Sequence, residues 1–252
     1  MVSDGIDVLV DDLAAEQQSI VDAVTSITED EWLSPTESWG WDVRDTISHL
    51  ADTDDIAVAT CVGGLRSLGS LIEGCGSPED LTLLGVMIGR KMPGRDVLQW
   101  WERARTREQD ALRDLDPNTR VPWGLGMRPP SFVTARMMET WAHGLDVRSA
   151  LGIPDVDTDR LAHVAWLAVR ALPYAYMVAG VDTPTTPLRI ELTLPSGKKW
   201  VHGPSDAPDY IRGPAGQFCR VFVQRMRASD ASELKAEGIG ASLALSVARA
   251  YL

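Results

Sequence analysis

A carboxylate and an imidazole stand four residues apart at Glu139 and His143, inside a segment with a helical pattern. On a helix, side chains at that spacing lie one turn apart, with about 5–6 Å between their Cβ atoms, so both can reach one ion. A third ligand must come from another segment, and His49, in a second helical pattern, is the best candidate. Two neutral imidazoles and a carboxylate suit zinc, and iron or nickel less exclusively. The sequence therefore predicts a divalent-metal site made of His49, Glu139 and His143.

An ordinary surface pair also fits this spacing. Glu139 and His143 share a polar line along their helix with Arg136 and Asp146. Oppositely charged pairs at such positions are common and contribute only about 0.2–0.5 kcal/mol. Three protein ligands with an open fourth position would instead be the arrangement of a catalytic zinc. Residue spacing alone leaves both interpretations open.

Four long amphipathic patterns are available to position the three residues. Apolar residues recur every three or four positions over residues 6–27, 42–68, 95–115 and 131–151, and a shorter helix is expected over 78–89. Asp42 can cap the helix that carries His49. Loops rich in proline, glycine and tryptophan separate these segments. The pattern predicts an antiparallel four-helix bundle over residues 1–155.

The pattern changes after residue 155. A helix is expected over 158–178, strands over 188–194, 199–203 and 210–212, and helices over 215–227 and 239–251. The apolar stretch 161–181 contains His163 and Arg170 and is interrupted by Pro173, so we expect a core helix there and not a membrane span. Residues 156–252 are therefore predicted to form a small α+β domain, and the whole chain belongs to the α+β class.

Composition limits the partners. The formal net charge of the 252 residues is −12, which argues against nucleic acid or an anionic membrane as the main partner. The N-terminal residues show no secretory signal, and Cys61, Cys75 and Cys219 follow no disulfide or metal-binding spacing. We expect reduced thiols and a cytoplasmic location.

Two segments, 39–50 (WGWDVRDTISHL) and 139–147 (ETWAHGLDV), resemble the mycothiol-dependent maleylpyruvate isomerase family, within the broader DinB-like metal-binding bundles. In that family a tryptophan-led helix supplies one histidine, and a later Glu-x-x-x-His helix supplies the other two ligands. The resemblance thus makes His49, Glu139 and His143 the metal ligands. It covers the bundle well, whereas the C-terminal part is similar only in layout to the family's sterol-carrier-like domain.

The resemblance also implies a chemistry. A bound divalent metal, zinc or else nickel or iron, would activate a low-molecular-weight thiol for S-transfer to a small electrophile or for its isomerisation. Arginine far outnumbers lysine among the 24 basic residues, which is compatible with a high-GC bacterial genome and hence with mycothiol as the thiol. The alternatives are a non-catalytic metal-binding protein and a metal-dependent hydrolase with water at the open position.

The C-terminal arginines are weaker candidates. Arg220, Arg225 and Arg227 could bring positive charge to a carboxylate substrate, and Arg225 is the one we select as a catalytic candidate. No cofactor-binding motif beyond the metal ligands is recognised. The sequence names neither the electrophile nor the oligomeric state, and a homodimer is compatible with it.

Overall fold

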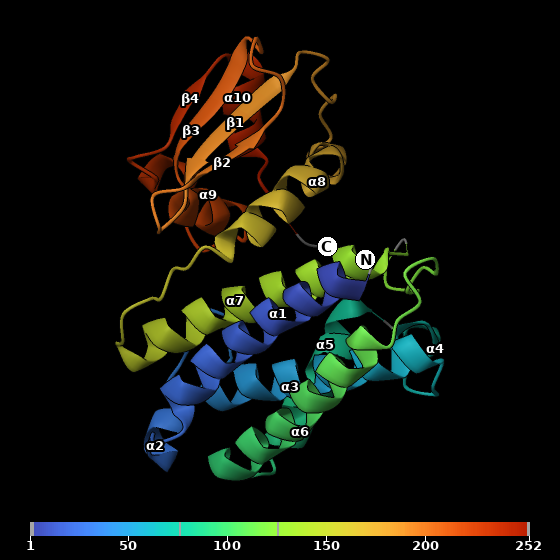
Figure 1. The fold of residues 1–252 in the computed structure, drawn as a ribbon. Coiled ribbons are helices and arrows are strands. Elements are labelled where there is room, and N and C mark those ends of the chain that lie inside the picture. Colours follow the sequence, from blue (N-terminus) through green and yellow to red (C-terminus); the bar gives the residue numbers. More distant parts are fainter. Residues whose placement is uncertain (1–2, 76, 125, 251–252) are drawn as a thin grey trace. The chain divides into compact units, whose positions relative to one another are not determined.

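Long helices make up most of the N-terminal part of the computed structural model, which describes residues 3–75, 77–124 and 126–250 (Figure 1). They are α1 (Ser3–Val24), α3 (Val43–Val62), α6 (Gly94–Arg113) and α7 (Pro129–Leu151). Helix α1 packs chiefly against α7, and α3 chiefly against α6. The chain divides into two units, Met1–Asp155 and Val156–Leu252, and all four helices belong to the first.

Two clusters of buried apolar side chains hold the helical unit together. One gathers residues from the C-terminal half of α1 and the N-terminal halves of α3 and α6, including Ile20, Ile47 and Trp101. The other gathers residues from the opposite ends of the same helices, including Leu13 and Leu112. Burying side chains of this size contributes about 1.5–3 kcal/mol each. The described part of the bundle therefore has apolar clusters toward both ends, and buried Gln17 of α1, Asp54 of α3 and Glu108 of α6 lie between them along each helix.

Shorter helices fill the connections. Helix α2 (Glu29–Trp32) lies in the first expected loop, and α5 (Pro78–Gly89) has the bounds that the pattern predicts. Helix α3 ends at Val62, six residues before the expected end, because Gly63 adopts a left-handed conformation with φ +73°. Glycine takes this conformation without steric cost and ends helices in this way. Helix α4 (Leu68–Gly74) then begins as a separate element.

The C-terminal unit holds a mixed four-stranded sheet with the order β2-β1-β3-β4. Strand β1 (Leu188–Thr193) pairs antiparallel with β2 (Lys199–His202) and parallel with β3 (Asp209–Pro214), and β3 pairs antiparallel with β4 (Lys235–Glu237). The predicted α+β class is confirmed. The pattern did not predict β4, a three-residue strand too short to show alternation.

Helices precede, separate and follow the strands along the chain. Helix α8 (Leu161–Ala179) packs against α9 (Ala215–Phe222), and α10 (Ile239–Ser246) contacts β3 and β4. The helix expected over 158–178 is present, and α8 continues through Pro173. By length and composition α8 could cross a membrane, a test that core helices also pass. Tyr251, the expected end of the last helix, lies outside the described residues.

Candidate metal centre

His49 is positioned by the start of α3. Asp42 caps that helix by accepting a hydrogen bond from the backbone N of Asp45 at 2.7 Å, and Asp45 accepts one from the backbone N of Asp42 in return. Such a reciprocal box satisfies two backbone donors that the helix itself leaves unpaired. The helix therefore begins at a defined residue, and His49 follows almost two turns later with its side chain buried.

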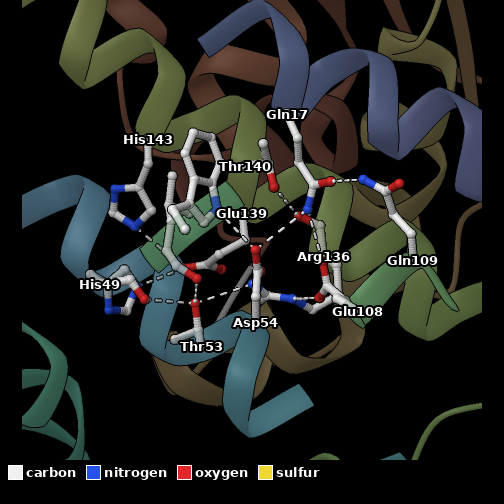
Figure 2. A network of polar contacts seen from close by, with 12 residues as sticks. Gln17, His49, Thr53, Asp54, Glu108, Gln109, Arg136, Glu139, Thr140 and His143 are labelled. Atoms are coloured by element: carbon white, nitrogen blue, oxygen red, sulfur yellow. Dashed lines mark hydrogen bonds and ion pairs between the residues drawn. The ribbon is translucent and has the colours of Figure 1, made fainter. Parts of the chain in front are cut away.

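Glu139 and His143 come from the middle of α7 and meet His49 (Figure 2). One oxygen of Glu139, Oε1, lies 3.7 Å from Nε2 of His49 and 3.4 Å from Nε2 of His143. The imidazole rings are 4.9 Å apart and lie edge to face. One candidate donor atom from each of the three residues falls within 4.8 Å of the other two. The structure therefore brings together all three predicted ligands.

The donor set fits a divalent cation. Bonds of about 2.0–2.2 Å in tetrahedral geometry place neighbouring donors about 3.3–3.5 Å apart, close to the two separations that Glu139 makes. The side chains of His49 and His143 are 9% and 10% exposed, whereas that of Glu139 is 30% exposed. A cation held here would thus be shielded by the imidazoles and reachable on the carboxylate side.

A second carboxylate orients His143. Oδ2 of Asp146 lies 3.1 Å from Nδ1 of His143, and Oγ of Ser38 donates to the same oxygen at 3.4 Å. A carboxylate that accepts a hydrogen bond from Nδ1 keeps the proton on that nitrogen, so that Nε2 can face a metal, as is usual for metal-bound histidines. We did not predict this role for Asp146, although its position three residues after His143 is compatible with it.

Trp41 contacts both imidazoles. Its ring centroid lies 5.2 Å from that of His49, with the rings tilted, and 6.2 Å from that of His143, with the rings stacked. The indole therefore restricts the positions of both rings and provides an apolar surface beside them.

The charge states of the three side chains depend on one another. Burial lowers the pKa of His49 below its ordinary value. Burial acts in the same direction on His143, but hydrogen bonds to Asp146 and Glu139 outweigh it and raise the pKa of His143 to about 9. Burial acts to raise the pKa of Glu139, but the two histidines hold it well below the usual range. Without a metal, neutral pH therefore favours an ionised Glu139 beside a protonated His143, and metal binding must displace that proton.

The C-terminal arginines lie in the other unit. We expected Arg225 and Arg227 on a helix over 215–227, but α9 ends at Phe222 because Gln224 adopts a left-handed conformation with φ +58°. Arg225 follows in a turn and donates to the backbone carbonyl of Val223 at 3.0 Å. Arg220 is held by Asp157 through bonds of 2.8 and 3.0 Å. A role for Arg225 toward a substrate stays a prediction.

Comparison with protein families places one known domain on the helical unit. Residues 13–148 match the model described as "Mycothiol maleylpyruvate isomerase N-terminal domain". The match spans α1 to α7 and includes all three candidate ligands.

Related proteins cover nearly the whole chain. Uncharacterized protein MT0041 of Mycobacterium tuberculosis (strain CDC 1551 / Oshkosh) and uncharacterized protein Rv0036c of strain ATCC 25618 / H37Rv are each 33% identical over 241 residues, which are 95% of this chain and 93% of the relative. The crystal structure of the mycothiol-dependent maleylpyruvate isomerase aligns with a TM-score of 0.60 at 15% identity, and that of its histidine-to-alanine mutant with 0.60 at 14%. Each alignment covers 92% of both chains and shows that the fold is shared.

Proposed function

Because the chain belongs to the family defined by the mycothiol maleylpyruvate isomerase N-terminal domain, we propose that it is a divalent-metal-dependent enzyme that activates a low-molecular-weight thiol. The thiol we propose is mycothiol, and the reaction is S-transfer to, or isomerisation of, a small electrophile. The observation that carries the proposal is the convergence of His49, Glu139 and His143, with candidate donor atoms within 4.8 Å of one another. Three protein ligands leave a fourth position for the thiol, as in catalytic zinc sites.

The side chains at the site have separate tasks. His49 and His143 would hold the metal through Nε2, and Glu139 would be its third ligand. Asp146 would keep His143 oriented, and Trp41 would pack against a bound thiol or electrophile. Access from the half-buried Glu139 side would let the ligand enter without displacing a histidine.

A divalent metal at this position would supply the charge that deprotonates a coordinated thiol near neutral pH. The thiol proton would pass to solvent, and the sulfur electron pair would form a C–S bond at a conjugated carbon of the electrophile. In an isomerisation, rotation about the resulting single bond would precede cleavage of the C–S bond and recovery of the double bond. In a transfer, the C–S bond would remain and the neighbouring carbon would take up a proton.

Metal analysis tests the site itself. The protein purified without chelator should contain about one divalent ion per chain, and His49→Ala should lose it. His202→Ala is the matched control, because His202 is an exposed strand residue of the C-terminal unit that stacks on Trp200. Retention of the metal by His49→Ala would refute the site.

Thermal shifts test the thiol. Mycothiol should raise the melting temperature of the metal-loaded protein more than an equal concentration of glutathione, and should have no effect on His49→Ala. Equal shifts of the melting temperature with both thiols would indicate a thiol-dependent enzyme that does not distinguish mycothiol from glutathione. If neither thiol stabilises a protein that does hold metal, the thiol part of the proposal is wrong.

A further inference from the structure

A layer of buried polar side chains lies beside the candidate ligands, with one member from each long helix (Figure 2). Gln17 belongs to α1, Asp54 to α3, Glu108 to α6 and Arg136 to α7. The side chains of Arg136, Asp54 and Glu108 are only 1–3% exposed. We call these four residues the polar layer.

Hydrogen bonds connect the polar layer across all four helices. Arg136 donates through Nε to Oε1 of Glu108 at 2.8 Å and through NH2 to Oδ1 of Asp54 at 2.7 Å. The remaining carboxylate oxygens also have donors, since Gln17 donates to Oε2 of Glu108 at 2.9 Å and Trp101 donates to Oδ2 of Asp54 at 2.9 Å. Every carboxylate oxygen of the layer is therefore satisfied, as buried polar groups require.

Arg136 also connects the polar layer to the ligands. It precedes Glu139 by three residues on α7, so the two lie on neighbouring turns of one face. Its NH2 donates to Oγ1 of Thr53 at 3.1 Å, and that hydroxyl donates to the backbone carbonyl of His49 at 2.8 Å. A single guanidinium thus connects the helix that carries Glu139 and His143 with the turn that carries His49.

The packing of the bundle makes this connection important. Helices α1 and α7 form one well-packed pair and α3 and α6 form another, whereas α3 and α7 contact each other less extensively. The ligands lie on α3 and α7 and therefore belong to different pairs. A shift of one pair along the other would separate His49 from Glu139 and His143.

We propose that Arg136 is a positioning residue of the metal centre, which fixes α7 against α3 and α6 and so holds His49 within reach of Glu139 and His143. The inference rests on the metal site of the proposed function. Buried ion pairs are a weak source of stability, because desolvation offsets their attraction, but they can specify one register among several. Arginine suits this role because its rigid fork binds two carboxylates at once, and lysine cannot reproduce that geometry.

The test separates positioning from stability. Arg136→Lys keeps the charge and loses the fork. Arg113→Lys is the matched control, because Arg113 also joins two helices through Asp7 and Asp11 but lies outside the polar layer. Leu112→Ala, in the second apolar cluster, destabilises the bundle without changing the polar layer. For each variant we would measure the Zn²⁺ dissociation constant by chelator competition, the visible spectrum with Co²⁺ and the urea unfolding of the metal-free protein.

Arg136→Lys should bind Zn²⁺ about 10–100-fold more weakly, the usual effect of losing a residue that orients the metal ligands, and should change the Co²⁺ spectrum. Arg113→Lys and Leu112→Ala should keep the original affinity and spectrum, even where urea unfolding shows lower stability. Unchanged affinity and spectrum in Arg136→Lys would overturn the inference while leaving the metal site intact. Absence of Zn²⁺ binding by the unsubstituted protein would instead contradict the proposed function.

A second variant decides the matter if Arg136→Lys does not fold. Thr53→Val keeps both ion pairs of Arg136 and removes only the hydroxyl between its NH2 and the carbonyl of His49. Thr53→Val should also weaken Zn²⁺ binding, by a smaller factor than Arg136→Lys. Zn²⁺ affinity equal to that of the unsubstituted protein in Thr53→Val would then overturn the inference.

Discussion

His143 is the residue whose protonation should control both metal binding and stability. Its pKa is raised to about 9 in the metal-free fold, whereas an unfolded histidine titrates near 6.5. When folding raises the pKa of a histidine, the resulting stabilisation is complete at a pH below the pKa of the unfolded state. It is lost as the pH rises through the pKa of the folded state. With chelator present, the free energy of unfolding should therefore fall by about 3 kcal/mol from pH about 6.5 to above about 9, as measured by urea denaturation.

Cysteine titration would add to this loss at the alkaline end. Burial raises the pKa of the Cys61 thiol to about 12, so unfolded thiols lose protons above pH about 8.5 while the folded one does not. The variant His143→Gln, measured in parallel, isolates the contribution of the histidine, because the free energy of unfolding of this variant should change little below pH about 8.5. A slope equal to that of the unsubstituted protein in this range would exclude His143 as the source.

Asp146 should tune the same imidazole. Asp146→Asn keeps a hydrogen-bond acceptor near Nδ1 but removes the charge, so the pKa of His143 should fall and Zn²⁺ affinity should drop about 10–100-fold. An NMR titration of the His143 ring protons and chelator competition measure the two effects. Asp22→Asn, on the exposed face of α1, is the control and should change neither. An unchanged pKa in Asp146→Asn would show that Glu139 alone raises it.

Residue spacing could predict some of these side chains and not others. Glu139 and His143 are visible because the helical period puts both on one face, and His49 because few histidines are available in the chain. The role of Arg136 was not predictable, since its partners Asp54 and Glu108 lie 82 and 28 residues away in sequence. Contacts of that kind depend on how helices pair, which a pattern along one helix does not encode.

Among the elements, periodicity predicted helices better than it predicted their ends. The apolar stripe of α3 continues in sequence past Gly63, but the left-handed conformation of that glycine ends the helix. Helix α9 ends before Gln224, which takes the same left-handed conformation although it is not a glycine. The backbone N of Arg225 donates to the carbonyl of Arg220, and this bond closes a Schellman motif at the end of the helix. Gly63 therefore marks the end of α3 in the sequence, whereas no glycine marks the end of α9.

The contact between α5 and α3 depends on Gly85. A Cβ on Gly85 would lie 2.9 Å from the backbone oxygen of Ser48, next to His49, and would also collide with the side chain of Asp52. Gly85→Ala should therefore destabilise the protein by about 1–3 kcal/mol, despite the better helix propensity of alanine. Gly69→Ala is the control within α4, where a Cβ meets nothing within 4 Å, and should stabilise by about 0.5–1 kcal/mol. Urea denaturation compares them, and a stabilising Gly85→Ala would show that α5 can move away from α3 at low cost.

At the scale of the whole molecule, the two units should respond differently to metal. All three candidate ligands lie in Met1–Asp155, whereas the sheet belongs to Val156–Leu252. A ligand at about 100 times its dissociation constant stabilises the state that binds it by about 2.7 kcal/mol. Because units open separately when their cores are separate, this gain should be confined to the unit that holds the site.

Hydrogen exchange measured by mass spectrometry can resolve this difference. Saturating Zn²⁺ should slow amide exchange in α3 and α7 up to about 100-fold and leave β1 and β3 unchanged, and His49→Ala should show neither effect. Equal slowing in both units would mean that they unfold as one cooperative body, and the stability of the sheet would then also depend on the metal. Slowing confined to α7 would indicate that His49 takes no part in binding, because α3 would gain no stability from the metal.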